Sequence, residues 1–330
     1  MKRREFITLV GGAAAGWPLA ARAQQPDRMR LIGVLMGYVE SDRVAQSWLA
    51  AFRGALPKLG WTEGSNLRIE LRWSADDPDR MRTLAKELVD LRPNAILGVT
   101  TPVIAALARE TRTISIVFTG VSDPIGSGFA ANLAHPGGNI TGFTVNDPSL
   151  GGKWVELLKE IAPRTLRVAL LFNPATTVPI QYFMPSIQTA ASSFGVQVSA
   201  TPFHAKDEIE GIIAAQGRDP EGGLIVMPDV SNDVNRDLIV ALAARYRVPT
   251  IYYNHFFSEL GGLVSYGDDR SEPFRLAAGY IDRILKGDKP ADLPVQAPTK
   301  FELIINLKTA KALGLTISRD FLLIADEVIE

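Results

Sequence analysis

The residues best suited to bind a small molecule follow short apolar segments, where polar side chains and prolines interrupt the sequence. Hydroxyl and backbone N–H groups at Thr100, Thr101 and Ser122 suit a carboxylate. The carboxyl groups of Asp123 and Asp229 suit an ammonium group. Ser, Thr, Asp and Asn next to proline are also common helix caps, so each residue alone has a structural explanation. The full candidate set is Tyr38, Thr100, Thr101, Ser122, Asp123, Asn173, Asp229, Tyr252, Asn254 and Tyr266.

Aromatic residues form a second signal, because several tyrosines lie close to these polar segments. The rings of Tyr38, Tyr252 and Tyr266 could hold the apolar part of a ligand. They could equally pack beneath the loops, as buried aromatic side chains commonly do.

The segment 126–131 has the G-x-G-x-x-A spacing of a dinucleotide-binding loop. A true fingerprint follows its strand directly and opens a full helix. Here Asp123 and Pro124 come between the strand and the glycines, and residues 135–138 (HPGG) end the segment early. We therefore expect no nucleotide cofactor.

Catalytic and metal-binding patterns are weak. The three histidines, His135, His204 and His255, lie far apart, and the chain has no cysteine to complete a metal site. A hydrolase built on Ser122 lacks the G-x-S-x-G elbow of such enzymes. We expect neither a metal nor catalysis, and a secreted α/β enzyme remains the alternative.

Apolar periodicity predicts an α/β fold. Continuous apolar runs are typical of parallel strands buried on both faces, and amphipathic stripes between them predict helices. The pattern pauses at 135–139 and then resumes, which indicates two successive α/β units. In such sheets ligands bind beyond the carboxyl ends of the strands, where the candidate residues lie. The expected strands are 31–36, 67–73, 95–99, 114–118, 168–172, 196–200, 224–227, 250–253 and 301–306, with helices at 102–110, 150–161, 180–194 and 272–285.

The first residues have the features of an export signal. Lys2, Arg3 and Arg4 precede a short apolar stretch, and residues 21–23 (ARA) predict cleavage after Ala23. The paired arginines favour the twin-arginine route, and the general secretory route is the alternative. The apolar stretch is too short to span a membrane stably. We expect a periplasmic protein.

Composition limits the partners. The net charge of −1 gives no indication of nucleic acid or anionic lipid as a partner. Without cysteine, the chain has neither a disulfide nor a cysteine for lipid attachment. We expect a monomer without direct membrane insertion.

Several segments together resemble the ABC transporter substrate-binding family that includes tryptophan- and tyrosine-type binding proteins. They are residues 33–35 (GVL), 119–128 (TGVSDPIGSG), 136–142 (PGGNITG), 170–174 (LLFNP) and 298–311 (PTKFELIINLKTAK). The resemblance implies the type I periplasmic-binding architecture, in which two flavodoxin-like lobes with parallel sheets are joined by three crossovers. The ligand would lie in the cleft between the lobes.

This resemblance and the pattern of elements define the expected organisation and function. We expect lobe 1 to comprise 24–147 plus about 267–298, and lobe 2 to comprise 148–266 plus about 299–330. The protein would be the solute-binding component of an ABC importer. It would close by a hinge on an amino acid or an aromatic or apolar acid and deliver it to an inner-membrane permease. A receptor that presents its ligand to a sensor kinase is a further alternative.

Overall fold

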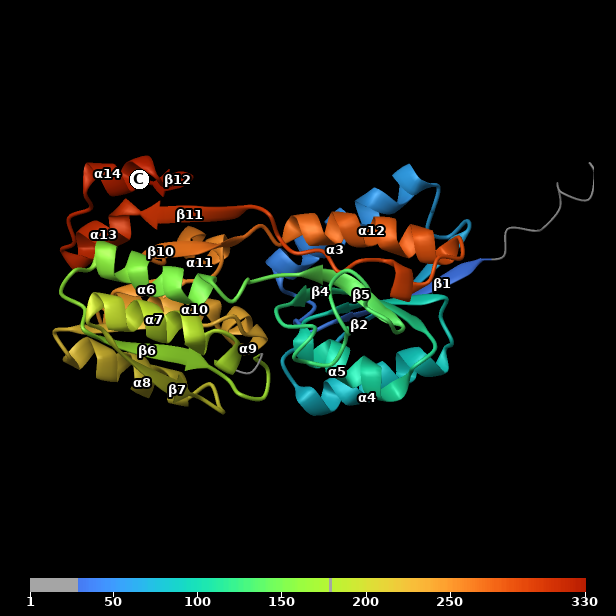
Figure 1. The fold of residues 1–330 in the computed structure, drawn as a ribbon, viewed down its shortest axis with the longest axis horizontal. Coiled ribbons are helices and arrows are strands. Elements are labelled where there is room, and N and C mark those ends of the chain that lie inside the picture. The colour runs from blue at the N-terminus through green and yellow to red at the C-terminus, as the bar shows by residue number, and fades with distance from the viewer. Residues whose placement is uncertain (1–28, 178–179) are drawn as a thin grey trace, which may run out of the picture.

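The computed structural model describes residues 29–177 and 180–330, which form two lobes, each built on one β-sheet with flanking helices (Figure 1). The first sheet has the order β2-β1-β3-β4-β5, and all its neighbours are parallel. This is the doubly wound order, in which later strands are added on the other side of β1 from β2. Its strands are β1 (Arg30–Met36), β2 (Leu67–Trp73), β3 (Ala95–Val99), β4 (Ser115–Val121) and β5 (Ile140–Thr144).

Helices cover both faces of the first sheet. Helices α3 (Arg43–Ala55) and α12 (Ser271–Leu285) pack together on one face, and α4 (Pro78–Asp90) and α5 (Thr101–Glu110) on the other (Figure 1). Asp42 starts α3 by accepting hydrogen bonds from the first free N–H groups of the helix. Helix α12 comes from a much later part of the chain than its neighbours, so the first lobe is discontinuous in sequence.

The second sheet has the order β12-β11-β10-β9-β8-β6-β7. Five strands repeat the doubly wound order, and β11 joins β10 antiparallel. The strands are β6 (Arg167–Phe172), β7 (Gln197–Pro202), β8 (Gly222–Val226), β9 (Thr250–Tyr252), β10 (Val264–Asp268), β11 (Phe301–Asn306) and β12 (Glu327–Ile329). The helices are α6 (Leu150–Ile161), α7 (Met184–Phe194), α8 (Glu208–Arg218), α9 (Val230–Val234), α10 (Arg236–Arg245), α11 (His255–Glu259), α13 (Leu307–Leu313) and α14 (Arg319–Leu323).

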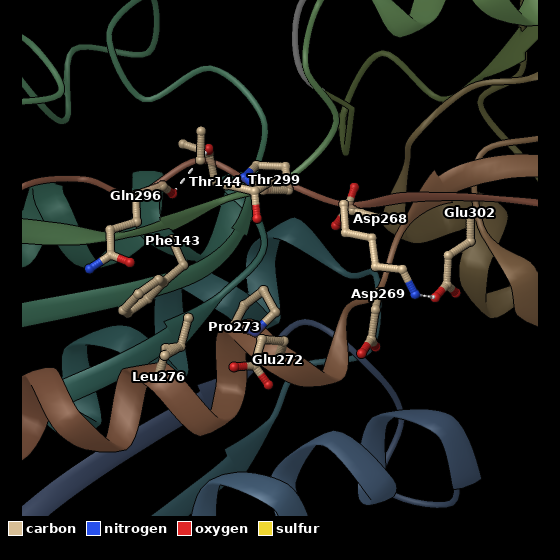
Figure 2. Close-up of a pocket in the computed structure, with 13 residues that line it drawn as sticks. Phe143, Thr144, Asp268, Asp269, Glu272, Pro273, Leu276, Gln296, Thr299 and Glu302 are labelled. Atoms are coloured by element: carbon tan, nitrogen blue, oxygen red, sulfur yellow. Dashed lines mark hydrogen bonds and ion pairs between the residues drawn. The ribbon is translucent and has the colours of Figure 1, made fainter.

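Three connections join the lobes: from β5 to α6, from β10 to α12, and from the end of α12 to β11. The first and third are bonded to each other, because the Thr144 N–H donates to the Gln296 carbonyl oxygen at 2.8 Å. A groove of about 270 Å³ lies beside all three (Figure 2). Its walls are Phe143, Thr144, Asp268, Asp269, Glu272, Pro273, Leu276, Gln296, Ala297, Pro298, Thr299, Lys300 and Glu302.

The structure confirms the α/β class and the two parallel-sheet lobes. The helix predicted over 180–194 is instead a 3-10 turn at Ile180–Tyr182 followed by α7, because Pro185 occupies the first turn of a new helix. The sequence does not predict β5. Its Gly142 lies so close to Phe118 that a Cβ atom would stand 2.2 Å from the Phe118 carbonyl oxygen. The predicted export signal lies outside the described residues.

Candidate functional site

A small cavity lies between the lobes at the carboxyl ends of strands from both sheets. The first lobe supplies residues after β1, β3, β4 and β5, and the second supplies residues after β6, β8 and β10. The remaining space is about 20 Å³, which admits roughly one water molecule. The walls are Tyr38, Thr100, Thr101, Gly120, Ser122, Asn146, Thr176, Pro228, Asp229, Val230, Asp233 and Arg270.

The first-lobe wall has an unusual backbone. Thr100, Gly120 and Asn146 all have positive φ angles, of 89°, 71° and 55°. Residues with side chains rarely adopt such angles, and they gather at functional sites where the surrounding structure enforces them. Thr100 precedes the first residue of α5, yet its side chain makes no capping hydrogen bond. Its hydroxyl is therefore not used to stabilise the helix.

The second-lobe wall is organised by Asp229. Its carboxylate accepts hydrogen bonds from the Thr176 hydroxyl and from the N–H groups of Asn173 and Ser231. Burial raises the pKa of Asp229 to about 7, against the opposing effect of these hydrogen bonds. With its oxygens occupied by the protein, Asp229 positions the loops after β6 and β8.

A buried charged cluster forms the floor of the cavity. Asp233 accepts hydrogen bonds from the Tyr253 hydroxyl and, at 3.0 Å, from the Tyr38 hydroxyl of the other lobe. The Arg270 guanidinium lies 3.7 Å from Asp233 and stacks 5.2 Å above the Tyr253 ring. Burial raises the pKa of Asp233 and of Tyr38. Burial also opposes the charge on Arg270, but the nearby Asp233 carboxylate keeps the pKa of Arg270 above its ordinary range.

Several buried polar atoms at this cavity have no hydrogen-bond partner within the described part of the chain. They are Thr100 Oγ1, Asn146 Oδ1 and Arg270 Nε, and Asp268 Oδ2 is a fourth beside them. The Asn146 N–H donates to the other Asp268 oxygen at 3.0 Å. Because buried polar atoms normally find partners, the cavity holds unused donors and acceptors in one small volume.

Direct polar contacts link the lobes around this cavity. Arg236 forms two hydrogen bonds with Asp42, at 2.6 and 3.2 Å, and the Asp42 side chain is only 3% exposed. The Ser231 hydroxyl donates to Asp76 at 3.0 Å. With the Tyr38–Asp233 bond these contacts hold the lobes closed on one another.

Comparison with known proteins assigns the family. The model for the family described as ABC transporter substrate binding protein matches residues 35–329. The chain belongs to this family. A tyrosine-binding protein from Clostridioides difficile is 26% identical over 272 residues, which span 80% of this chain and 75% of that protein.

Solved structures show the same fold. An ABC domain from Streptococcus pneumoniae in complex with L-Trp is 25% identical, with a TM-score of 0.83 and coverage of 91% of this chain and 99% of that chain. The ligand-free, open structure of a substrate-binding protein from Clostridium difficile is 22% identical, with a TM-score of 0.66. The match covers 91% of this chain and 99% of that chain. This substrate-binding protein thus superposes better on the ligand-bound relative than on the open one. Over the described residues, no helix is both long and apolar enough to cross a membrane.

Half of the predicted site residues line the cavity of this substrate-binding protein. They are Tyr38, Thr100, Thr101, Ser122 and Asp229. Asn173 lies behind the wall, where its N–H donates to Asp229 and its side chain caps the following turn.

The other four predicted residues lie elsewhere. Asp123 accepts a hydrogen bond from the Gly126 N–H in a turn. Tyr252 is buried in the second-lobe core, stacked on Phe257. Asn254 caps α11 and bonds the Asp268 carbonyl oxygen. Tyr266 faces a shallow surface depression on the second lobe.

Sequence reasoning missed Asn146, Thr176, Asp233 and Arg270, all of which line the cavity. Arg270 carries a usable signal, because it lies four residues after Tyr266, which the sequence already marks as a candidate site residue. Asn146 follows β5, and without that strand the sequence gives no reason to single it out.

Proposed function

We infer that this substrate-binding protein of an ABC transporter binds a small carboxylate-bearing molecule, and specifically an amino acid, in the cavity between its lobes. One observation carries the proposal: the start of α5, with Thr100, Thr101 and Ser122, borders a buried polar cavity. The N-terminus of a helix favours anions, because its N–H groups and dipole point toward them. One relative is named a tyrosine-binding protein, and another was crystallised in complex with L-Trp.

Ligand entry requires the lobes to separate, since the closed cavity admits only about one water molecule. In this proposal the three connections act as the hinge, and the groove beside them leaves room for bending (Figure 2). The lobes are then 24–147 with about 267–298, and 148–266 with about 299–330. Closure would present a surface formed by both lobes to an inner-membrane permease.

Export to the periplasm completes the proposal, because substrate-binding proteins of ABC importers work outside the cytoplasm. The signal is cleaved after Ala23, and the mature protein acts as a monomer without catalysing a reaction. Mass spectrometry of a periplasmic extract should give a chain that begins at Gln24. A periplasmic chain that keeps residues 1–23 would contradict this cleavage.

Replacing Ser122 or Thr101 by alanine should weaken ligand binding by roughly one to two orders of magnitude. Each change removes a hydroxyl at the cavity, and one hydrogen bond to a charged group contributes about 1.5 to 3 kcal/mol. Calorimetric titration with L-tyrosine and L-tryptophan measures the affinity, and a melting curve on the same variant measures stability. The melting temperature should hardly change.

The opposite pattern identifies a helix-capping role. If affinity is preserved while stability falls by about 1 kcal/mol, these residues only cap helices and the site proposal is wrong. A useful control is Ser193→Ala, because that hydroxyl bonds the Thr189 carbonyl oxygen within α7, on the surface. Ligand recovered after the titration should be chemically unchanged, as expected for binding without turnover.

A further inference from the structure

Arg270 contributes a buried cationic side chain to the cavity wall. Its side chain is only 7% exposed, and its nearest carboxylate, Asp233, is 3.7 Å away. Its Nε has no hydrogen-bond partner among the residues that the structure describes. A buried guanidinium normally uses its planar set of donors on a carboxylate or carbonyl group. Here one nitrogen lies near Asp233 beyond hydrogen-bond distance, Nε is unused, and the residue lines the cavity.

Thr100 provides a second donor in the wall of the same cavity. It is 5% exposed, and its Oγ1 also has no partner in the part of the chain that the structure describes. Gly37 leaves room for this hydroxyl, because a Cβ on residue 37 would come within 2.6 Å of it. Arg270, the Thr100 hydroxyl and the start of α5 thus surround one volume with groups that favour an anion.

The protein's own carboxylates lie near Arg270, with Asp233 3.7 Å away and Asp268 helping to raise the pKa of Arg270, but neither forms a hydrogen bond with it. Asp229 is occupied by Thr176 and two backbone N–H groups, and Asp233 is occupied by Tyr38 and Tyr253. Both are fixed by hydrogen bonds in the second lobe or across the cleft. The unused capacity of Arg270 therefore points to an anion from outside the chain.

The cavity wall also contains a hydrogen-bond acceptor, which favours a cationic group and not an anion. Asn146 is 1% exposed, its side-chain amide lies 3.4 Å from the Ser122 hydroxyl, and its Oδ1 has no partner within the described residues. Asp268, which is 2% exposed, receives the Asn146 N–H and adds negative charge behind it. This corner favours a cationic donor such as an ammonium group.

We propose that Arg270 and Thr100 bind the carboxylate of the ligand and that Asn146 accepts a hydrogen bond from its ammonium group. The site would then select free zwitterionic α-amino acids over their amides and over acids without the amino group. This inference rests on the proposed function, namely an amino acid in this cavity. Arg270 and Asn146 also lie in two connections between the lobes, so the same contacts would couple binding to closure.

The test compares three matched ligands on each variant by calorimetry. A thermal-shift screen of the standard L-amino acids first identifies the tightest binder. For tyrosine the matched set is L-tyrosine, L-tyrosinamide and 3-(4-hydroxyphenyl)propionate. The wild-type protein should bind the amino acid about 10- to 100-fold more tightly than either analogue, because each analogue leaves one charged contact unmade.

In Arg270→Gln and Thr100→Val the preference for the amino acid over its amide should shrink, while the preference over the desamino acid should persist. In Asn146→Gly the preference over the desamino acid should shrink, while the preference over the amide should persist. Glycine tolerates the positive φ at this position. Thr119→Val is the matched control for Thr100→Val. Thr119 also carries a buried hydroxyl that has no partner among the described residues, but it lies outside the cavity wall. It should bind all three ligands as the wild type does.

A purely structural role for Arg270 and Thr100 would weaken all three ligands alike and leave the ratios unchanged. That result would overturn this inference. Thr100→Val keeps the shape of the side chain, so it decides the question even if Arg270→Gln does not fold. If the wild type binds an amino acid and its amide equally well, this inference fails and the proposed function stands. If it binds none of the standard amino acids at about 1 mM, both fail.

Discussion

Raising the pH from about 5 to about 8 should lower the free energy of unfolding by about 2.5 kcal/mol. The cause is Asp229, whose pKa in the folded protein is raised to about 7 by burial. In the unfolded chain the same group titrates near pH 4, so between these values the folded state holds the extra proton. The stabilisation is present below about pH 4 and is lost as the pH rises through about 7. Burial raises the pKa of Asp233 and Asp268 as well, which adds to the same trend.

Urea unfolding at a series of pH values measures this effect. In Asp229→Asn the free energy of unfolding should change less steeply between about pH 5 and pH 8, whatever the variant's absolute stability. Asp219→Asn is the control, because Arg167 lowers the pKa of that half-buried surface carboxyl to about 2. Its influence is confined to acidic pH. A wild-type protein whose stability is flat over the range would show that Asp229 stays ionised when folded.

Arg236→Leu should shift the balance between closed and open forms toward the open form by about 10- to 100-fold. Arg236 makes two charge-assisted hydrogen bonds to Asp42 across the cleft, in a nearly buried position. Asp42 would keep its hydrogen bonds to the N–H groups of Val44 and Ala45, so α3 should stay intact. Small-angle X-ray scattering of the ligand-free protein should then give a larger radius of gyration.

Arg245→Leu is the matched control for this experiment. Arg245 pairs with Glu210 at 3.0 Å on the surface of one lobe, where both side chains are well exposed. An exposed pair contributes little, and removing it leaves the contacts across the cleft in place. If Arg236→Leu and Arg245→Leu give the same scattering profile as the wild type, the Asp42–Arg236 pair does not control closure.

The sequence predicts the sheets well because their central strands are buried on both faces. Continuous apolar runs such as Ile32–Met36 and Val168–Phe172 are therefore readable without tertiary context. The strand β5 is not, because Gly142 interrupts its apolar pattern and its place against Phe118 is set by backbone packing.

The candidate site divides along similar lines. The strand-end rule finds Thr100, Thr101 and Ser122, because it needs only the end of a strand and the start of a helix. It fails for Tyr252, since successive residues of a strand point to opposite faces. Tyr252 stacks in the core, while the hydroxyl of its neighbour Tyr253 reaches Asp233. Arg270 enters the cavity only because the chain crosses between the lobes there.

The closed cavity also has a kinetic consequence. Its walls come from both lobes, and the lobes are joined directly by the Asp42–Arg236, Tyr38–Asp233 and Asp76–Ser231 contacts. The space between them admits only about one water molecule, so an amino acid cannot be accommodated until these contacts part. The rate of association is then bounded by the rate at which the lobes open, however high the ligand concentration.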